Sequence, residues 1–253
     1  MAEGPGPAAG DVTFHRDGGI GWLRFTHPHR LNLITQSMLA AIRSTALELA
    51  DSAEIDALVV TGRPDMFSGG GDLNELGGRD FEANAEYIRI EHDAIDFVEK
   101  LPFITVAAIA GACVANAAEM SLACDFRVVT DDVRWGLVEV HAGAMGPAHR
   151  ISRYLGIGRA KELVYSGRIL GSAEMLELGL ANRVVPAGSL EAETRKFIET
   201  FTAPPSAIRL AKANFYQVPE PAERVRALNG CGTRAYQDAI ESLLRKPPGR
   251  ESQ

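Results

Sequence analysis

The stretch PFITVAAIAGACVANAAEMSLACD, which runs from Pro102 to Asp125, decides the fold. It begins with an uninterrupted apolar run, Phe103–Ala110, and such a run is typical of a strand buried on both faces of a sheet. Gly111 then turns the chain, and we predict a helix that starts at Asn116, because asparagine is a favourable helix N-cap. A short buried strand followed by a turn and a helix indicates an α/β protein.

The segments on either side of this stretch repeat the alternation of short strands and helices. The sequence Asp17-Gly18-Gly19 between two strand-like segments predicts a β-hairpin, and Thr35 is a suitable N-cap for an amphipathic helix. The predicted strands are Val12–Arg16, Ile20–Phe25, Ala57–Thr61, Phe103–Ala110, Asp125–Thr130 and Arg134–Val140, and the predicted helices are Thr35–Ala50, Asn84–Glu99 and the one that carries Glu119.

Length and composition set the domain organisation. The chain has 253 residues, of which 46% are hydrophobic and 23% charged, enough to bury a sizeable core. Residues 1–10 are small and rich in Pro, Gly and Ala, which predicts a flexible tail. The composition changes at about Thr202, where Pro204-Pro205 precedes helix-like segments. We therefore expect a core over residues 11–201 and a helical oligomerisation region over residues 202–253.

Charge and cysteine content exclude several classes of function. The formal net charge is −7 and no run of basic residues occurs, so neither a nucleic acid nor a membrane surface is an expected partner. No apolar run approaches the ~18 residues of a transmembrane helix, and the first residues do not resemble a signal peptide. Cys113, Cys124 and Cys231 have no CxxC spacing, which argues against a disulfide framework or a zinc site. We expect a cytoplasmic protein without a metal.

Two glutamates lie in surroundings that are unusual for a carboxylate. The helical neighbours of Glu119 are apolar, and Glu139 follows Trp135 and Leu137 in a strand-like alternation. A solvated helix position for Glu119 and a solvent-facing strand edge for Glu139 are the structural alternatives. Burial raises the pKa of a carboxyl group, so two buried glutamates near one pocket would form an acid/base pair.

The glycine triplet Gly69-Gly70-Gly71 follows a predicted strand, where it forms either a flexible turn or a loop that brings backbone N–H groups close to a ligand. Neither the Gly-Lys-Ser/Thr of a P-loop nor a dinucleotide fingerprint accompanies it. The helix predicted at Asn116 offers further free N–H groups. One N–H from each loop would make an oxyanion hole, which stabilises charge on a carbonyl oxygen.

These segments together resemble one protein family. Residues 67–73, FSGGGDL, resemble the F-[CS]-A-G-A-D-[LI] motif of the enoyl-CoA hydratase/isomerase (crotonase) superfamily. Residues 119–125, EMSLACD, resemble its E-L-A-L-A-C-D motif, and residues 135–139, WGLVE, resemble F-G-L-P-E. Residues 106–111, 155–160 and 178–186 also match the family pattern. The resemblance covers residues 12 to 245.

The resemblance implies a fold, an assembly and a site. The fold would be a spiral of ββα units with a C-terminal helical region, assembled as a homotrimer or hexamer that binds acyl-CoA thioesters without a further cofactor. Gly71 and Asn116 would form the oxyanion hole, and Glu119 and Glu139 would be catalytic. The remaining substrate-binding positions implied by the resemblance are Gly69, Gly70, Asp72, Leu73, Gly143, Arg30 and Lys246.

Some of these positions keep alternatives, and some depart from the family pattern. Arg30 is equally interpreted as a solvated arginine, and Lys246 would act from a neighbouring subunit. Ala115-Asn116-Ala117 stands where the family usually has three glycines, which predicts a smaller or reshaped acyl pocket. The segment from Gly146 to Arg150 departs from the usual P-G-x-G-G, and His149 within it is either a structural or exposed residue or a position close to the ligand.

The predicted activity is the addition of water to the 2,3 double bond of a 2-enoyl-CoA. One glutamate would accept a proton from the attacking water and the other, for which we favour Glu139, would supply a proton to C2. A double-bond isomerase, or another acyl-CoA lyase or hydrolase of the superfamily, is the alternative within this class. A non-catalytic acyl-CoA-binding protein is the alternative of a different class.

Overall fold

The computed structural model describes residues 11–76, 81–144 and 146–215. The chain divides into two compact units, Met1–Phe201 and Thr202–Gln253. Within the second unit the structure describes one helix, α8 (Pro205–Phe215). The assignment of residues 202–253 to subunit contacts stays a prediction, and most of that region lies outside the described residues.

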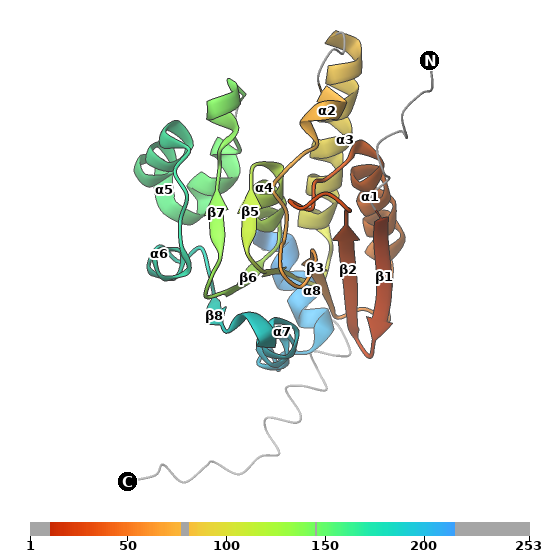
Figure 1. The fold of residues 1–253 in the computed structure, drawn as a ribbon. Coiled ribbons are helices and arrows are strands. Elements are labelled where there is room, and N and C mark those ends of the chain that lie inside the picture. Colours follow the sequence, from red (N-terminus) through yellow and green to blue (C-terminus); the bar gives the residue numbers. More distant parts are fainter. Residues whose placement is uncertain (1–10, 77–80, 145, 216–253) are drawn as a thin grey trace, which may run out of the picture. The chain divides into compact units, whose positions relative to one another are not determined.

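A six-stranded sheet forms the centre of the first unit (Figure 1). Its strand order is β1-β2-β3-β4-β6-β8, in which only the β1–β2 pair is antiparallel. The strands are β1 (Asp11–Asp17), β2 (Ile20–Thr26), β3 (Ala57–Thr61), β4 (Ile104–Ile109), β6 (Phe126–Thr130) and β8 (Arg183–Val185). The predicted hairpin is confirmed, with its turn at Gly18-Gly19.

The apolar runs recognised in the sequence form the central strands. Every residue of β3 and β4 is buried, as expected for parallel strands that are covered on both faces. The two strands pair in parallel from Ala57 opposite Ile104 to Thr61 opposite Ala108. The described α-helices of this unit are α1 (Gln36–Ala50), α2 (Leu73–Leu76), α3 (Phe81–Lys100), α4 (Asn116–Ala123), α5 (Ala148–Ser166), α6 (Ser172–Glu177) and α7 (Leu190–Glu199).

A second, two-stranded sheet of β5 (Ala112–Val114) and β7 (Arg134–Gly136) gives the chain its spiral path. Two turns of the chain, β4–β5–α4 and β6–β7–η1, each enter the large sheet, then the small sheet, and then a helix, where η1 is the 3₁₀-helix Glu139–Ala142. This succession is the ββα repeat that the family resemblance implies.

Two of the expected element boundaries are wrong. The strand predicted over Arg134–Val140 ends at Gly136, because its partner β5 is only three residues long, and Glu139 begins η1 instead. The N-cap of α4 is Ala115, not Asn116, so Asn116 is the first helical residue. Ala115 has φ 54° and ψ −134°, a strained conformation for a residue with a Cβ atom.

Buried polar contacts fix α4 against the strands around it. The indole Nε1 of Trp135 in β7 donates to Ser121 Oγ at 3.0 Å, and Ala115 N donates to Gly136 O at 3.0 Å. At the other end of α4, the buried guanidinium of Arg127 donates to the carbonyl oxygens of Ser121 and Cys124, both at 3.0 Å. A cation at a helix C-terminus satisfies the last carbonyl groups and complements the helix dipole.

Within the part of the chain that the structure describes, every helix is too short or too polar to span a membrane. Cys113 and Cys124 are buried free thiols, and Cys231 lies outside the described residues.

The N-cap of α1 gives a test of the fold. Thr35 Oγ1 accepts a hydrogen bond from Met38 N at 3.3 Å, so Thr35→Ala should lower the free energy of unfolding by about 1 kcal/mol. Thr35→Ser keeps the hydroxyl and should retain most of that stability. Urea denaturation of the three proteins measures both effects, and equal losses in the two variants would contradict the role of the hydroxyl as a cap.

Candidate active site

Glu119 lies in the first turn of α4, and its side chain is 12% exposed. Its Oε1 accepts a hydrogen bond from Nη1 of Arg150 at 2.9 Å. Burial raises the pKa of the Glu119 carboxyl, and the charge and hydrogen bond of Arg150 act in the opposite direction. The structural alternative of a solvated helix position is therefore excluded, and Glu119 is a buried carboxyl group paired with a cation.

Glu139 begins the 3₁₀-helix η1, which ends at Gly143 in the left-handed conformation (φ 72°). Its Oε2 is buried and has no hydrogen-bond partner among the described residues. This oxygen lies 3.6 Å from the point where a Cβ atom on Gly146 would stand. Burial raises the pKa of Glu139 to about 7, so this carboxyl group changes its charge near neutral pH.

The negative charge of Glu119 acts on Glu139. Burial is the largest cause of the raised pKa of Glu139, and a backbone hydrogen bond acts against it. The negative charges of Glu119 and Glu91 raise this pKa further. Glu91 in α3 is itself buried, and its pKa is raised by burial and by the charge of Glu119. Carboxyl groups that repel one another in this way titrate as a coupled set, which suits proton transfer at a shared site.

The two N–H groups predicted to form the oxyanion hole lie on neighbouring segments. The N–H of Gly71 donates no hydrogen bond to any described residue, and the N–H of Asn116 lies at the start of α4, where a helix leaves its first donors free. A Cβ atom on Gly71 would stand 3.2 Å from Asn116 Nδ2. The structure thus brings both residues together, although Asn116 is not the cap of the helix.

The side chain of Asn116 is buried beside this pair of loops. Its Nδ2 donates to Glu91 Oε1 at 2.6 Å, and its Oδ1 has no partner among the described residues. A Cβ atom on Gly71 would also lie 2.9 Å from the hydroxyl oxygen of Tyr87. The amide of Asn116 and the hydroxyl of Tyr87 therefore occupy space that opens because residue 71 lacks a side chain.

The other predicted binding residues fall into two groups. Gly69 and Gly70 belong to the same loop, which is bonded to its surroundings through Gly69 N to Leu31 O at 2.7 Å and Ile34 N to Gly70 O at 2.9 Å. Asp72 is buried and accepts from Asn74 N and Nδ2, both at 2.9 Å, so it orders the start of α2. Leu73, Gly143 and Arg30 are exposed, and Lys246 lies outside the described residues.

Arg150 is the residue that sequence reasoning missed. The sequence singled out its neighbour His149, but the side chain of His149 is exposed whereas that of Arg150 is buried against Glu119. Glu91 and Tyr87 were missed as well, because they belong to an amphipathic helix, α3, whose pattern does not show which residues reach another helix. The departure of residues 146–150 from the family pattern was the available signal for Arg150.

The described residues contain no group of three or more His, Cys, Asp or Glu side chains arranged to hold a metal ion. The absence of a cofactor stays a prediction.

Comparison with known proteins identifies the family. Residues 15–233 match the family model for enoyl-CoA hydratase/isomerase. The chain belongs to the enoyl-CoA hydratase/isomerase family. This match confirms three predictions made from the sequence: the superfamily, the fold class and the assignment as an enzyme.

Individual relatives within the family agree with this assignment. The chain is 34% identical over 221 residues to the probable enoyl-CoA hydratase EchA17 of Mycobacterium tuberculosis, covering 84% of this chain and 83% of that protein. It is 31% identical over 208 residues to the probable enoyl-CoA hydratase echA8 of Mycobacterium bovis, covering 79% of each. The crystal structure of enoyl-CoA hydratase from Bacillus anthracis superposes with a TM-score of 0.84 at 26% identity, covering 92% of this chain and 95% of that one.

The open space at Gly71 leads to a prediction about packing. Gly71→Ala places a methyl group 2.9 Å from the Tyr87 hydroxyl oxygen, and such overpacking should lower the free energy of unfolding by about 1–3 kcal/mol. In a Tyr87→Phe background the nearest atom is removed and the cost should shrink. The matched control is Gly158→Ala in α5, where a Cβ atom meets nothing within 4 Å. Urea denaturation that shows equal costs in both backgrounds would refute the contact.

The raised pKa of Glu139 predicts how its removal changes stability with pH. The folded protein holds this proton up to about pH 7, whereas an ordinary glutamate releases it near 4.5. The contribution of Glu139 to the free energy of unfolding therefore falls as the pH rises from about 4.5 to about 7. Relative to wild type, Glu139→Gln should gain about 1–3 kcal/mol between pH 5 and pH 8.

The control for that experiment is Glu174→Gln. The hydrogen bond from Arg168 holds the pKa of Glu174 below its usual value, so Glu174 stays ionised in both the folded and the unfolded protein between pH 5 and pH 8. The stability difference between this variant and wild type should therefore not change over that range. Chemical denaturation across the pH range gives both comparisons, and a flat difference for Glu139→Gln would show that Glu139 titrates normally.

Proposed function

We propose that this member of the family is an enoyl-CoA hydratase, which adds water across the 2,3 double bond of a 2-enoyl-CoA thioester. The observation that carries the proposal is the pair of largely buried carboxyl groups of Glu119 and Glu139, in which the charge of Glu119 raises the pKa of Glu139. The names of the relatives support the same activity.

The oxyanion hole activates the substrate. The thioester carbonyl oxygen accepts hydrogen bonds from the N–H groups of Gly71 and Asn116, and the dipole at the start of α4 adds to their effect. Electron density withdrawn toward this oxygen makes C3 electrophilic. When water attacks C3, the electron pair of the double bond moves through C2 to the carbonyl oxygen, where the hole stabilises the resulting enolate.

Glu119 and Glu139 divide the proton transfers. Arg150 stabilises the ionised form of Glu119, so Glu119 accepts the proton that the attacking water releases. Glu139 has a pKa of about 7 and an unpartnered oxygen, so it is protonated in a large part of the enzyme at neutral pH. It donates this proton to C2, and the C2–H bond completes the hydration.

Several properties of the enzyme belong to the same proposal. The substrate is the only source of coenzyme A, and no other cofactor takes part. The region 202–253 would join subunits into a homotrimer or hexamer, and the protein would work in the cytoplasm. Arg30 and Lys246 would approach the phosphates of coenzyme A. The motif series in the sequence supports these assignments by family resemblance.

One observation favours a double-bond isomerase as the second candidate. An isomerase needs a single carboxylate that moves a proton between C2 and C4. Glu119 is ion-paired with Arg150, whereas Glu139 has an oxygen without a partner in the described part of the chain. If the ion pair withdraws Glu119 from proton transfer, Glu139 alone would serve such a reaction.

Paired glutamine variants test the two-carboxylate mechanism. Glu119→Gln and Glu139→Gln each keep the shape of the side chain and remove the proton-transferring group, so each should slow hydration of 2-enoyl-CoA substrates by about 10²–10⁴. In deuterated water, Glu119→Gln should still exchange the C2 protons of a saturated acyl-CoA, because that exchange needs no attacking water. Glu139→Gln should lose the exchange.

The outcomes separate the candidates. Intact hydration in Glu119→Gln would refute the two-carboxylate mechanism, and double-bond migration in that variant would favour the isomerase. Wild type that binds acyl-CoA esters but neither hydrates nor exchanges them would favour a non-catalytic binding protein.

A further inference from the structure

We propose that Arg150 is a positioning residue, which holds Glu119 ionised and oriented for the attack of water through a carboxylate network that links α3, α4 and α5. The proposal rests on the hydratase function assigned to Glu119. In this proposal Arg150 does not contact the substrate. It sets the charge and the orientation of Glu119, which accepts the proton from the attacking water.

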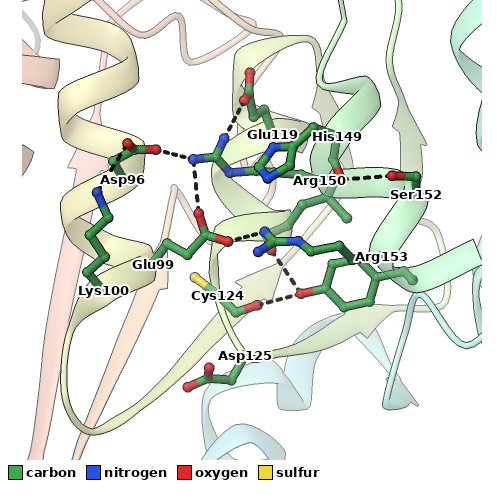
Figure 2. A network of polar contacts seen from close by, with 12 residues as sticks. Asp96, Glu99, Lys100, Glu119, Cys124, Asp125, His149, Arg150, Ser152 and Arg153 are labelled. Carbon is green, nitrogen blue, oxygen red and sulfur yellow. Dashed lines mark hydrogen bonds and ion pairs between the residues drawn. The ribbon is translucent and has the colours of Figure 1, made fainter. Parts of the chain in front are cut away.

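The geometry places Arg150 between Glu119 and two acidic residues of α3 (Figure 2). Nη1 donates to Glu119 Oε1 at 2.9 Å, while Nη2 lies 3.0 Å from Glu99 Oε2 and also donates to Asp96 Oδ1. Nη1 of the planar guanidinium therefore contacts α4, and Nη2 contacts α3. Because the guanidinium group is planar and rigid, the contacts of Nη2 with α3 fix the position from which Nη1 donates to Glu119.

The burial of the network explains why it needs several members. The side chains of Arg150 and Glu99 are each 7% exposed, and a buried charge is stable only when it is paired. Arg153 contacts Glu99 from the same helix as Arg150, and Lys100 lies 3.4 Å from Asp96. Arg150 is thereby held in place by carboxylates other than Glu119.

The charges that face Glu119 come from three elements. From α3, Asp96 opposes its ionisation and His92 favours it. The charge of Glu119 raises the pKa of Glu91 in α3 and of Glu139 in η1, and by the same repulsion these groups oppose the ionisation of Glu119 when they are charged. Arg150 of α5 provides both an attractive charge and a hydrogen bond to the carboxylate. Removal of Arg150 leaves Glu119 facing mainly negative charge, and the carboxyl group then keeps its proton to higher pH.

Opposite changes in the network give opposite shifts, which damage to the fold cannot imitate. Arg150→Met should raise the pKa of Glu119 by about 1–3 units and lower kcat by about 10–100-fold. Arg150→Lys keeps the charge and loses the fork, so it should lower kcat with a smaller shift. Asp96→Asn removes an opposing charge at a half-exposed position and should lower the pKa of Glu119.

Two measurements follow the shift. The acidic limb of the kcat/KM profile against pH reports it during hydration, and ¹³C NMR of the labelled glutamate carboxyl groups reports it without turnover, with Glu119→Gln identifying the signal. The matched control is Arg168→Met, since Arg168 also bridges two carboxylates, Glu162 and Glu174, at the other end of α5. It should leave both measurements as in wild type.

The NMR result keeps this inference separate from the proposed function. A Glu119 signal that titrates alike in wild type, Arg150→Met and Arg168→Met overturns the role of Arg150, even if hydration is observed. If Arg150→Met does not fold, Arg150→Lys decides the question, and a kcat and a Glu119 titration unchanged from wild type in that variant overturn the role. The expected pair of opposite shifts supports the role of Arg150 even if wild type hydrates no tested 2-enoyl-CoA, a result that would count against the proposed function alone.

Discussion

The burial of a carboxyl group on a short, otherwise apolar helix is the constraint on which the site depends. Glu119 is surrounded on α4 by residues that belong to the core, and a carboxylate in such surroundings is costly without compensation. The protein compensates from a distance in sequence: Arg150 supplies the cation, and Asp96 and Glu99 hold its guanidinium from α3.

The same helix also has to be fixed in direction, because its first N–H group is proposed to take part in the oxyanion hole. Contacts at both ends of α4 achieve this. Ala115 bonds to Gly136 at the start, Trp135 bonds to Ser121 along the side, and Arg127 closes the end. Since Trp135 and Gly136 belong to the strand that leads into η1, these contacts also relate the position of Glu119 to that of Glu139.

The sequence was sufficient for features that depend on neighbours in the chain. The hairpin, the buried strands β3 and β4 and the cap at Thr35 follow from local patterns, and each occurs where expected. The strand predicted through Glu139 was wrong because its length depends on β5, a partner that no local pattern reveals.

The network around Arg150 was not predictable for a related reason. An arginine in α5 and acidic residues in α3 each look like solvated helix positions, and only the packing of both helices against α4 brings them together. The motifs located Glu119 and Gly71, but they carried no information on what neutralises or surrounds them.

The space left by Gly71 has a consequence for which residues the chain can combine. The family motif that the chain resembles has alanine at this position, and the family usually has glycine where this chain has Asn116. A methyl group at residue 71 and the amide at residue 116 would stand only 3.2 Å apart. The two positions therefore share one volume, and a larger side chain at one of them is matched by a smaller one at the other.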